Sequence, residues 1–250
     1  MSRNTFKLAI IVPIYNEDRT IIPFIAELKK SMLKINDLSR CILVDDGSND
    51  DTANLLKNTV NGSEQISLIR HPTNLGYGAA LKTGIGQTNA DLICVIDADD
   101  QYKSVDILSL IPFVQEYDMI VGARIAEAAK YFPWYQKLAK WLVCSILTFL
   151  FRQKIPDINS GLRIFRKDIA ENYFSILPNG FSFTSSLTLA MLLDGYKINY
   201  VPIAYFKRTG KSKIKVFSFT FNFIKSYSRI IYYKFFNDGL TVQKPQRQMG

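Results

Sequence analysis

The 250-residue chain has few of the residues that carry most metal and nucleophilic chemistry. Its three cysteines lie far apart in apolar runs, and its single histidine, His71, directly precedes Pro72. Without a Cys-x-x-Cys pair, neither a disulfide framework nor a cysteine zinc site is expected, and the chain fits a reducing compartment. A lone histidine also argues against histidine-ligated metals and a Ser-His-Asp triad. We interpret His71 as a loop residue rather than a catalyst.

Long hydrophobic runs are missing as well. The longest nearly apolar run, Trp141–Phe151, is well short of the ~18 residues that a membrane-spanning helix needs. The run Leu8–Ile14 is short, contains Pro13 and is followed by polar residues, so it is not typical of a secretory signal. We therefore expect no membrane-spanning segment. The pattern Gly-x-x-x-x-Gly-Lys-[Ser/Thr] is also absent, which argues against a P-loop nucleotidase.

Acidic residues are scarce in only one region. Residues 201–250 hold ten basic residues against Asp238, whereas residues 1–200 hold 21 basic and 21 acidic residues, so the net charge of +9 lies at the C-terminus. A nucleic-acid-binding domain usually carries positive charge through its folded core. We therefore expect a neutral globular body with a cationic C-terminal segment, and no nucleic-acid partner.

The first half of the chain alternates between short apolar runs and helix-like patterns. This alternation predicts an α/β fold with a parallel sheet whose strands are buried on both faces. The expected strands are Leu8–Val12, Cys41–Val44, Ile66–Ile69, Leu92–Ile96 and Met119–Val121. The expected helices are Ile21–Leu33, Asp51–Thr59, Ala79–Gly86 and Val105–Val114.

Four of these strands lead into polar clusters. The clusters are Pro13–Glu17, Asp45–Ser48, Asp97–Gln101 and Gly122–Arg124. One such cluster alone is also explained by a turn or a helix N-cap. Because ligands bind at the carboxyl ends of the strands in α/β sheets, four clusters in succession predict one shared pocket.

The third cluster contains two carboxylates, Asp97 and Asp99, directly after a strand. In an extended chain, residues two apart face the same side, and Gln101 continues this spacing with an amide oxygen. Hard oxygen donors without histidine or thiolate favour Mg²⁺ or Mn²⁺, with a diphosphate completing the coordination. Gly76 and Gly78 resemble a phosphate-binding loop, but we interpret them chiefly as turn and helix-entry residues.

Six segments stand in the order found in family-two glycosyltransferases, and they most resemble dolichol-phosphate mannose synthases and bacterial polyprenyl-phosphate glycosyltransferases. The segments are Pro13–Glu17, Val44–Ser48, Asp97–Asp99, Gly122–Arg124, Asp157–Arg163 and Arg208–Lys213, within residues 8–215. The resemblance implies a GT-A fold, which is the Rossmann-like fold of nucleotide-diphospho-sugar transferases. It also implies a GDP- or UDP-sugar donor, a divalent metal and inversion at the anomeric carbon.

The resemblance also implies roles for single residues. The expected contacts of the nucleotide sugar are Pro13, Tyr15, Glu17, Asp45 or Asp46, Asp97, Ala98, Arg208 and Lys213. The expected metal ligands are Asp97, Asp99 and Gln101. The expected catalytic residues are Asp99, Arg124 and Asp157. Ser160 and Arg163 match the segment near the acceptor phosphate. Ala123 stands where the family usually has serine, which is a small-for-small change.

One departure from the family concerns the catalytic base. Many relatives have an acidic residue where this chain has Phe183-Thr184-Ser185-Ser186. Asp157 is then the nearest candidate base. A phosphate acceptor needs no strong base, because its second ionisation lies at about pH 6.

Two segments, Phe132–Phe151 and Phe217–Phe235, combine aromatic and basic residues at helical spacing. Such helices suit an interfacial anchor on an anionic membrane. A core helix with a homo-oligomer interface is the alternative, and single-stranded nucleic acid is a poor third. We expect residues 1–215 to form the GT-A domain and residues 216–250 to form a membrane-associating tail.

The sequence thus predicts a peripheral (monotopic) glycosyltransferase at the cytoplasmic face of the cell membrane, moving one sugar from a nucleotide sugar to a polyprenyl phosphate. One rival is a transferase that acts on a saccharide hydroxyl, which would need a firm carboxylate base. The other is a non-catalytic membrane-binding scaffold, against which the intact Asp97, Asp99 and Arg124 argue.

Overall fold

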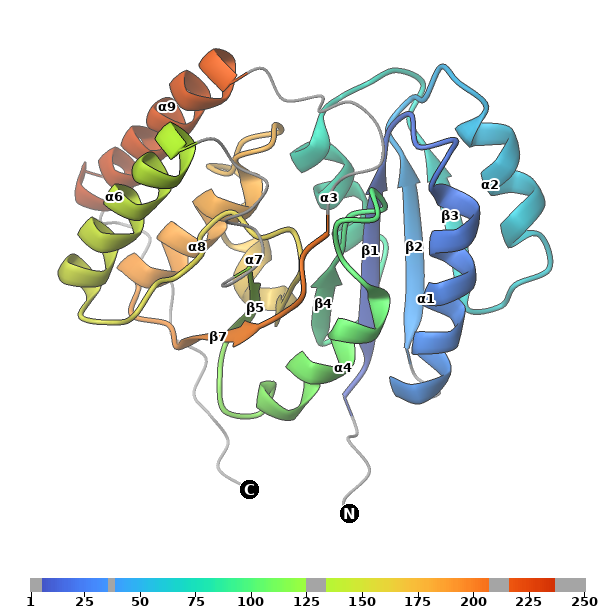
Figure 1. The fold of residues 1–250 in the computed structure, drawn as a ribbon, viewed down its shortest axis with the longest axis horizontal. Helices are drawn as coiled ribbons and strands as arrows, with labels where there is room; N and C mark the ends of the chain where they lie inside the picture. Colours follow the sequence, from blue (N-terminus) through green and yellow to red (C-terminus); the bar gives the residue numbers. More distant parts are fainter. Residues whose placement is uncertain (1–5, 36–38, 125–133, 207–215, 237–250) are drawn as a thin grey trace.

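The computed structural model describes residues 6–35, 39–124, 134–206 and 216–236 (Figure 1). In these residues the chain builds one seven-stranded sheet of order β3-β2-β1-β4-β6-β5-β7. The strands are β1 (Leu8–Ile14), β2 (Arg40–Asp45), β3 (Ile66–Arg70), β4 (Leu92–Val95), β5 (Met119–Ala123), β6 (Arg163–Arg166) and β7 (Ile198–Pro202). All five strands expected from the apolar runs are present, and their ends shift by one or two residues.

One strand departs from the parallel sheet that the sequence pattern predicts. β6 is antiparallel to both of its neighbours, β4 and β5, whereas the other strand pairs are parallel. Because β4 and β5 both oppose β6, they run in the same direction, and their carboxyl ends lie at the same edge of the sheet. The shared edge that the four polar clusters require is therefore kept.

The helices largely follow the sequence pattern. They are α1 (Ile21–Ile35), α2 (Thr52–Val60), α3 (Tyr77–Gly86), α4 (Ile107–Leu110), α6 (Trp134–Phe151), α7 (Lys167–Glu171), α8 (Phe183–Leu193) and α9 (Val216–Phe236). The single helix expected over Val105–Val114 is instead a short α4 between two 3₁₀ turns, Ser104–Asp106 and Ile111–Phe113. Pro112 in the second turn has no amide hydrogen to continue an α-helix.

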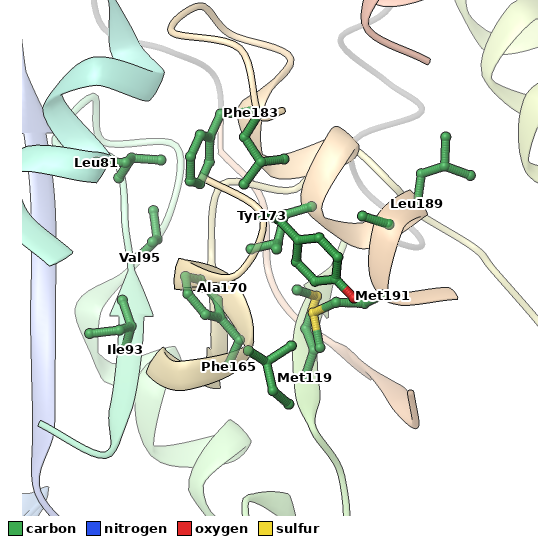
Figure 2. Packing of buried hydrophobic residues seen from close by; sticks show 14 of the residues in the cluster. Leu81, Ile93, Val95, Met119, Phe165, Ala170, Tyr173, Phe183, Leu189 and Met191 are labelled. Carbon is green, nitrogen blue, oxygen red and sulfur yellow. The ribbon is translucent and has the colours of Figure 1, made fainter. Parts of the chain in front are cut away.

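Both faces of the sheet carry a hydrophobic core. On β1, Ile10 and Val12 belong to the cluster that packs under α1 and α4, while Ala9 and Ile11 belong to the cluster on the other face. Successive strand residues point to opposite faces, which explains why these strands are apolar runs without alternation. Figure 2 shows the second cluster, where β4, β5 and β6 meet residues of α7 and α8, such as Ala170 and Met191.

The second half of α9 packs against α8. Ile230 is fully buried in the cluster shared with α8, Arg229 donates to the carbonyl of Ser175 at 2.9 Å, and Lys234 forms an ion pair with Asp194. Residues 225–236 therefore belong to the packed fold, and the boundary at residue 215 between domain and tail stays a prediction. Among the described helices, none combines the length and the hydropathy required to cross a bilayer.

Candidate active site

The chain reverses its direction across the sheet between β1 and β4. After β3 it passes back over β2 and β1 and adds β4 on the far side of β1. Ligands of open α/β sheets bind in the crevice at such a switch point, outside the carboxyl ends of the strands. The polar segments after β1, β2, β4 and β5 all begin at this edge, so the structure gathers the four clusters as expected.

The segments after β1 and β2 are joined by hydrogen bonds. The amide of Asn16 donates to Oγ of Ser48 at 2.9 Å, and the amide of Glu17 donates to Oγ1 of Thr52 at 2.8 Å. Asn16 has a φ of +52°, which asparagine tolerates better than most side chains. Pro13 lies within β1 beside Val44 of β2, and Tyr15 follows the strand, partly exposed. These hydrogen bonds join the segment that carries the expected nucleoside contacts Tyr15 and Glu17 to the segment after β2.

The two aspartates after β2 have different surroundings. Asp45 is fully buried, lies 3.1 Å from Nε of Arg70 and accepts the amide of Ser48 at 2.9 Å. Asp46 accepts a hydrogen bond from Nδ1 of His71 at 2.7 Å, and it also accepts the backbone amides of residues 75 and 76. Nε2 of His71 lies 2.9 Å from Oγ1 of Thr83. Asp46 and His71 therefore hold the loop that leads into α3.

That loop contains the two glycines that resemble a phosphate cradle. A Cβ on Gly76, which has a φ of +103°, would lie 2.5 Å from the carbonyl oxygen of Asn179. The same carbonyl accepts the amides of Gly78 at 2.7 Å and Ala79 at 3.1 Å. Because the first amides of α3 already bind Asn179, the turn and helix-entry interpretation fits the structure better than phosphate contact.

The segment after β4 places Asp97, Ala98 and Asp99 at the centre of the edge. Oδ1 of Asp97 accepts the hydroxyl of Tyr77 at 2.9 Å, and the carbonyl of Ala98 accepts the hydroxyl of Thr20 at 2.8 Å. Asp99 is 6% exposed and accepts the amide of Gln101 at 3.2 Å. Asp100, which lies between Asp99 and Gln101, has a φ of +62°, so the chain turns sharply at this residue.

Gln101 ties this segment to the chain beyond β7. Its side-chain amide donates to the hydroxyl of Tyr205, and its carbonyl accepts the amide of Phe206 at 3.1 Å. The ring of Tyr205 lies under the guanidinium of Arg124, with 5.1 Å between the guanidinium carbon and the ring centroid. Tyr205 also meets the ring of Tyr102 edge-on. Tyr205 therefore connects the expected metal site with the expected catalytic arginine.

Arg124 and Asp157 form a close, nearly buried ion pair. Nε and Nη2 of Arg124 donate to the two carboxylate oxygens of Asp157 at 2.6 and 2.8 Å. The side chain of Asp157 is fully buried, and that of Arg124 is 10% exposed. Two parallel bonds to a carboxylate fix the guanidinium plane. Two expected catalytic residues are thus brought together as partners.

Ser160 and Arg163 lie deeper than an acceptor contact would suggest, since both are fully buried. Oγ of Ser160 donates to the carbonyl of Gly122 at 2.5 Å. Nη1 of Arg163 donates to the carbonyl of Thr184 at 2.7 Å and to the hydroxyl of Thr188 at 2.8 Å. Through these contacts Ser160 binds to β5 and Arg163 binds to α8. A direct contact of either residue with the acceptor stays a prediction. Arg208 and Lys213 lie outside the described residues.

Comparison with known proteins identifies this arrangement. A family model described as glycosyl transferase family 2 matches residues 9–174, which include every described segment of the site up to Arg163. The chain belongs to glycosyl transferase family 2. The membership confirms the resemblance that the six sequence segments indicated.

Two curated relatives of this family-2 chain illustrate its range. It is 28% identical over 167 residues to the undecaprenyl-phosphate 4-deoxy-4-formamido-L-arabinose transferase of Proteus mirabilis, over 66% of the chain and 50% of that relative. It is 25% identical over 220 residues to the dolichyl-phosphate hexose transferase of Haloferax volcanii, over 87% of the chain and 91% of that relative. The chain thus spans about half the length of the first relative and most of the second.

A solved structure shows the fold of the family-2 chain. Glucosyl-3-phosphoglycerate synthase from Mycobacterium tuberculosis, in complex with Mn²⁺, UDP and glucosyl-3-phosphoglycerate, superposes with a TM-score of 0.68 at 16% sequence identity. The match covers 90% of the chain and 80% of the synthase. At this identity the likeness establishes the fold, which is the GT-A fold expected from the sequence.

The donor set of this family-2 site fits a hard divalent cation. No group of three or more His, Cys, Asp or Glu side chains gathers as a metal cage in the part of the chain that the structure describes. Asp97 and Asp99 nevertheless follow β4 two residues apart, with the Gln101 amide next in the spacing. Two carboxylates and an amide suit Mg²⁺ or Mn²⁺ when a ligand diphosphate supplies further oxygens.

The sequence reasoning missed three tyrosines of the site. They are Tyr77 at the start of α3, Tyr102 in the segment after β4 and Tyr205 in the segment after β7. Tyr102 accepts the amide of Gly161 at 2.8 Å. Burial raises the pKa of all three phenols, and the Asp97 carboxylate raises that of Tyr77 further, so they are neutral near pH 7. Only Tyr102 carried a signal, because it directly follows Asp97–Gln101.

Proposed function

We propose that the chain transfers one sugar, with inversion, from a nucleotide sugar to a polyprenyl phosphate. The observation that carries the proposal is the engagement of Asp157. Its carboxylate is bound bidentately by Arg124, and the first turn of α8 has the buried Thr184, Ser185 and Ser186 in the stretch where, by the resemblance, many relatives have an acidic residue.

The pairing of Asp157 favours an acceptor that is already an anion. A saccharide hydroxyl must lose its proton to a base during attack, whereas a phosphate monoester is largely dianionic above its second pKa of about 6. A paired carboxylate is a poor base, because its negative charge is already stabilised by the guanidinium. The names of the two curated relatives, which include undecaprenyl phosphate and dolichyl phosphate, support the same acceptor class.

On the donor side, we assign the nucleoside to Pro13 of β1 and to Tyr15 and Glu17, which follow that strand, with Asp45 of the neighbouring β2 beside them. Asp97, Asp99 and Gln101 would hold Mg²⁺ or Mn²⁺ together with the donor diphosphate. When bound, the cation would stabilise negative charge on the departing diphosphate. The neighbouring Arg124 adds a fixed positive charge at the end of β5. Arg208 and Lys213 remain candidates for the same task.

We also propose that the enzyme works at the cytoplasmic surface of a membrane, held there by α6. Six apolar side chains of α6 are exposed along one face, at helical spacing: Leu138, Trp141, Leu142, Ile146, Phe149 and Leu150. Phe149 is 83% exposed and Trp141 is 62% exposed. A continuous exposed apolar face of this size usually marks an interaction site.

The charges around α6 favour a lipid surface as the partner. Residues 134–154 contain no acidic residue, and the exposed Lys137, Arg152 and Lys154 flank the apolar face. Basic residues beside an apolar helix face bind anionic headgroups while the apolar side chains enter the interface. In Figure 1, α6 and α9 lie together at the edge of the molecule, and α9 adds the exposed Ile231, Tyr232 and Phe236.

The test is a transfer assay with a panel of labelled GDP- and UDP-sugars. Polyprenyl phosphate and the matching polyprenol are offered in parallel, and label is followed into the organic phase. We expect transfer to the phosphate and none to the alcohol. Equal transfer to the free alcohol would refute the phosphate acceptor and return the saccharide-hydroxyl class as the better candidate.

A further inference from the structure

The orientation of Asp97 is defined by two other parts of the chain. A carboxylate rotates readily about its last side-chain bond, because that torsion is broad. Here Oδ1 accepts the hydroxyl of Tyr77 at 2.9 Å. Oδ2 faces Gly161, where an added Cβ would come within 2.0 Å of it. The two oxygens therefore have different neighbours, and the plane of the carboxylate is set by residues outside β4.

Tyr77 is itself held from the segment before α8. It is the first residue of α3, whose next two amides, those of Gly78 and Ala79, bind the carbonyl of Asn179. Its ring stacks on the ring of Phe181, with 5.6 Å between centroids and 25° between planes. Backbone and side chain of Tyr77 are thus both fixed by the Asn179–Phe181 segment.

We propose that Tyr77 is a positioning residue for the metal-binding carboxylate. Its hydroxyl holds Asp97 in the orientation required for the cation and the donor diphosphate, and Phe181 holds the ring that carries this hydroxyl. The inference rests on the proposed donor site. It adds that the segment before α8, remote from β4 in sequence, controls metal affinity through one hydrogen bond.

The expected effect is on metal affinity. Removing a hydrogen-bond partner of a ligating residue typically weakens metal binding by about 10- to 100-fold. Because the Tyr77 hydroxyl is a neutral donor, we expect the lower end, about tenfold, for Tyr77→Phe. This variant keeps the ring and its stacking on Phe181. The KM for Mn²⁺ should rise, while kcat at saturating Mn²⁺ returns close to the wild-type value.

The experiment titrates the full chain with Mn²⁺ and follows unbound Mn²⁺ by electron paramagnetic resonance, once with UDP and once with GDP present. Tyr77→Phe should bind Mn²⁺ about tenfold more weakly, and Phe181→Leu should shift the affinity in the same direction by less. Tyr117→Phe is the matched control, because Tyr117 packs on Phe113 at the opposite edge of the sheet. Its Mn²⁺ affinity should equal that of the wild type.

The outcomes separate this inference from the proposed function. Unchanged Mn²⁺ affinity in Tyr77→Phe would overturn the positioning role. A drop in metal-free thermal stability beyond that of Tyr117→Phe, with no recovery of kcat at high Mn²⁺, would overturn it as well. A shifted Mn²⁺ affinity without any transfer to polyprenyl phosphate would support Tyr77 and refute the acceptor. No Mn²⁺ binding by the wild type with either nucleotide would overturn both.

Discussion

Arg124 holds both carboxylate oxygens of Asp157, with Nε and Nη2 at 2.6 and 2.8 Å. The pair joins the end of β5 to the loop that precedes β6. It also sets the guanidinium against the ring of Tyr205, which in turn binds Gln101. One ion pair therefore orients the arginine at the centre of the site and occupies the carboxylate that the sequence offered as a base.

Breaking this pair should destabilise the fold. Asp157→Asn leaves the nearly buried Arg124 without its counter-charge, which typically costs about 3 kcal/mol or more of unfolding free energy. The measurement is urea denaturation. The double variant Arg124→Met/Asp157→Asn should lose less than Asp157→Asn alone, because no buried charge remains unpaired. If Asp157→Asn had the same unfolding free energy as the wild type, the ion pair would not stabilise the fold.

Removing the charge of Asp99 should abolish most transfer. Asp99→Asn preserves the shape of the side chain but weakens its hold on a divalent cation, and we expect at least a ~100-fold loss of kcat, as for the loss of one electrostatic stabiliser. Asp100→Asn is the matched control, because asparagine tolerates the positive φ at this position. It should remain close to wild type. Wild-type activity that survives exhaustive chelation would contradict metal dependence.

Stability should fall at alkaline pH because of two buried thiols. Burial raises the pKa of Cys41 and of Cys94, which flank Ile10 on either side of β1. The unfolded chain releases these protons above about pH 8.5 while the folded chain keeps them, so the stability present below that pH declines as the pH rises. Each thiol accounts for about 1.4 kcal/mol per pH unit.

Urea unfolding at about pH 8 and pH 10 measures this decline, which lies in the window set by the thiol pKa. The variant Cys41→Ala/Cys94→Ala should lose less stability between the two pH values than the wild type. An equal loss in both proteins would assign the alkaline sensitivity to other groups.

Membrane binding should depend on the exposed face of α6. Trp141→Ser/Phe149→Ser should reduce co-sedimentation with anionic vesicles, while Leu33→Ser, at an equally exposed apolar residue of α1, should not. Wild-type binding should weaken at high salt, because screening shortens the reach of the basic residues to a few ångströms. It should persist in part, since apolar contacts are not screened. Equal sedimentation of the three proteins would exclude α6 as the anchor.

The sequence predicted strands β1 to β5 well, whereas β6 and β7 were not expected from it. Strands β1 to β5 coincide with short apolar runs that lead into polar residues. Such runs indicate strands that are buried on both faces of the sheet. β6 has the sequence Arg-Ile-Phe-Arg, in which only two residues are apolar, so it lacks the apolar run that predicts β1 to β5. Its antiparallel insertion is decided by long-range pairing with β4 and β5, which no local pattern records.

Some residues of the site could likewise be predicted from the sequence, and others could not. Asp97, Asp99 and Arg124 follow strands directly, so their shared edge was predictable from strand direction. The contacts of Arg163 with Thr184 and Thr188 were not, because they depend on how α8 packs behind β6. Tyr77 and Tyr205 were also unpredictable, since a tyrosine has the same local sequence pattern in a core and in a site.

The position of β6 has a consequence for folding on the ribosome. β1, β2, β3 and β4 can pair as soon as Val95 has emerged, whereas β5 must wait, because both of its partners, β6 and β7, are synthesised later. Until then the nascent chain exposes the open edge of β4 and the apolar residues of β5. Unpaired edges of this kind are prone to aggregation. A stalled or truncated chain ending before Arg163 is therefore the form most in need of a chaperone.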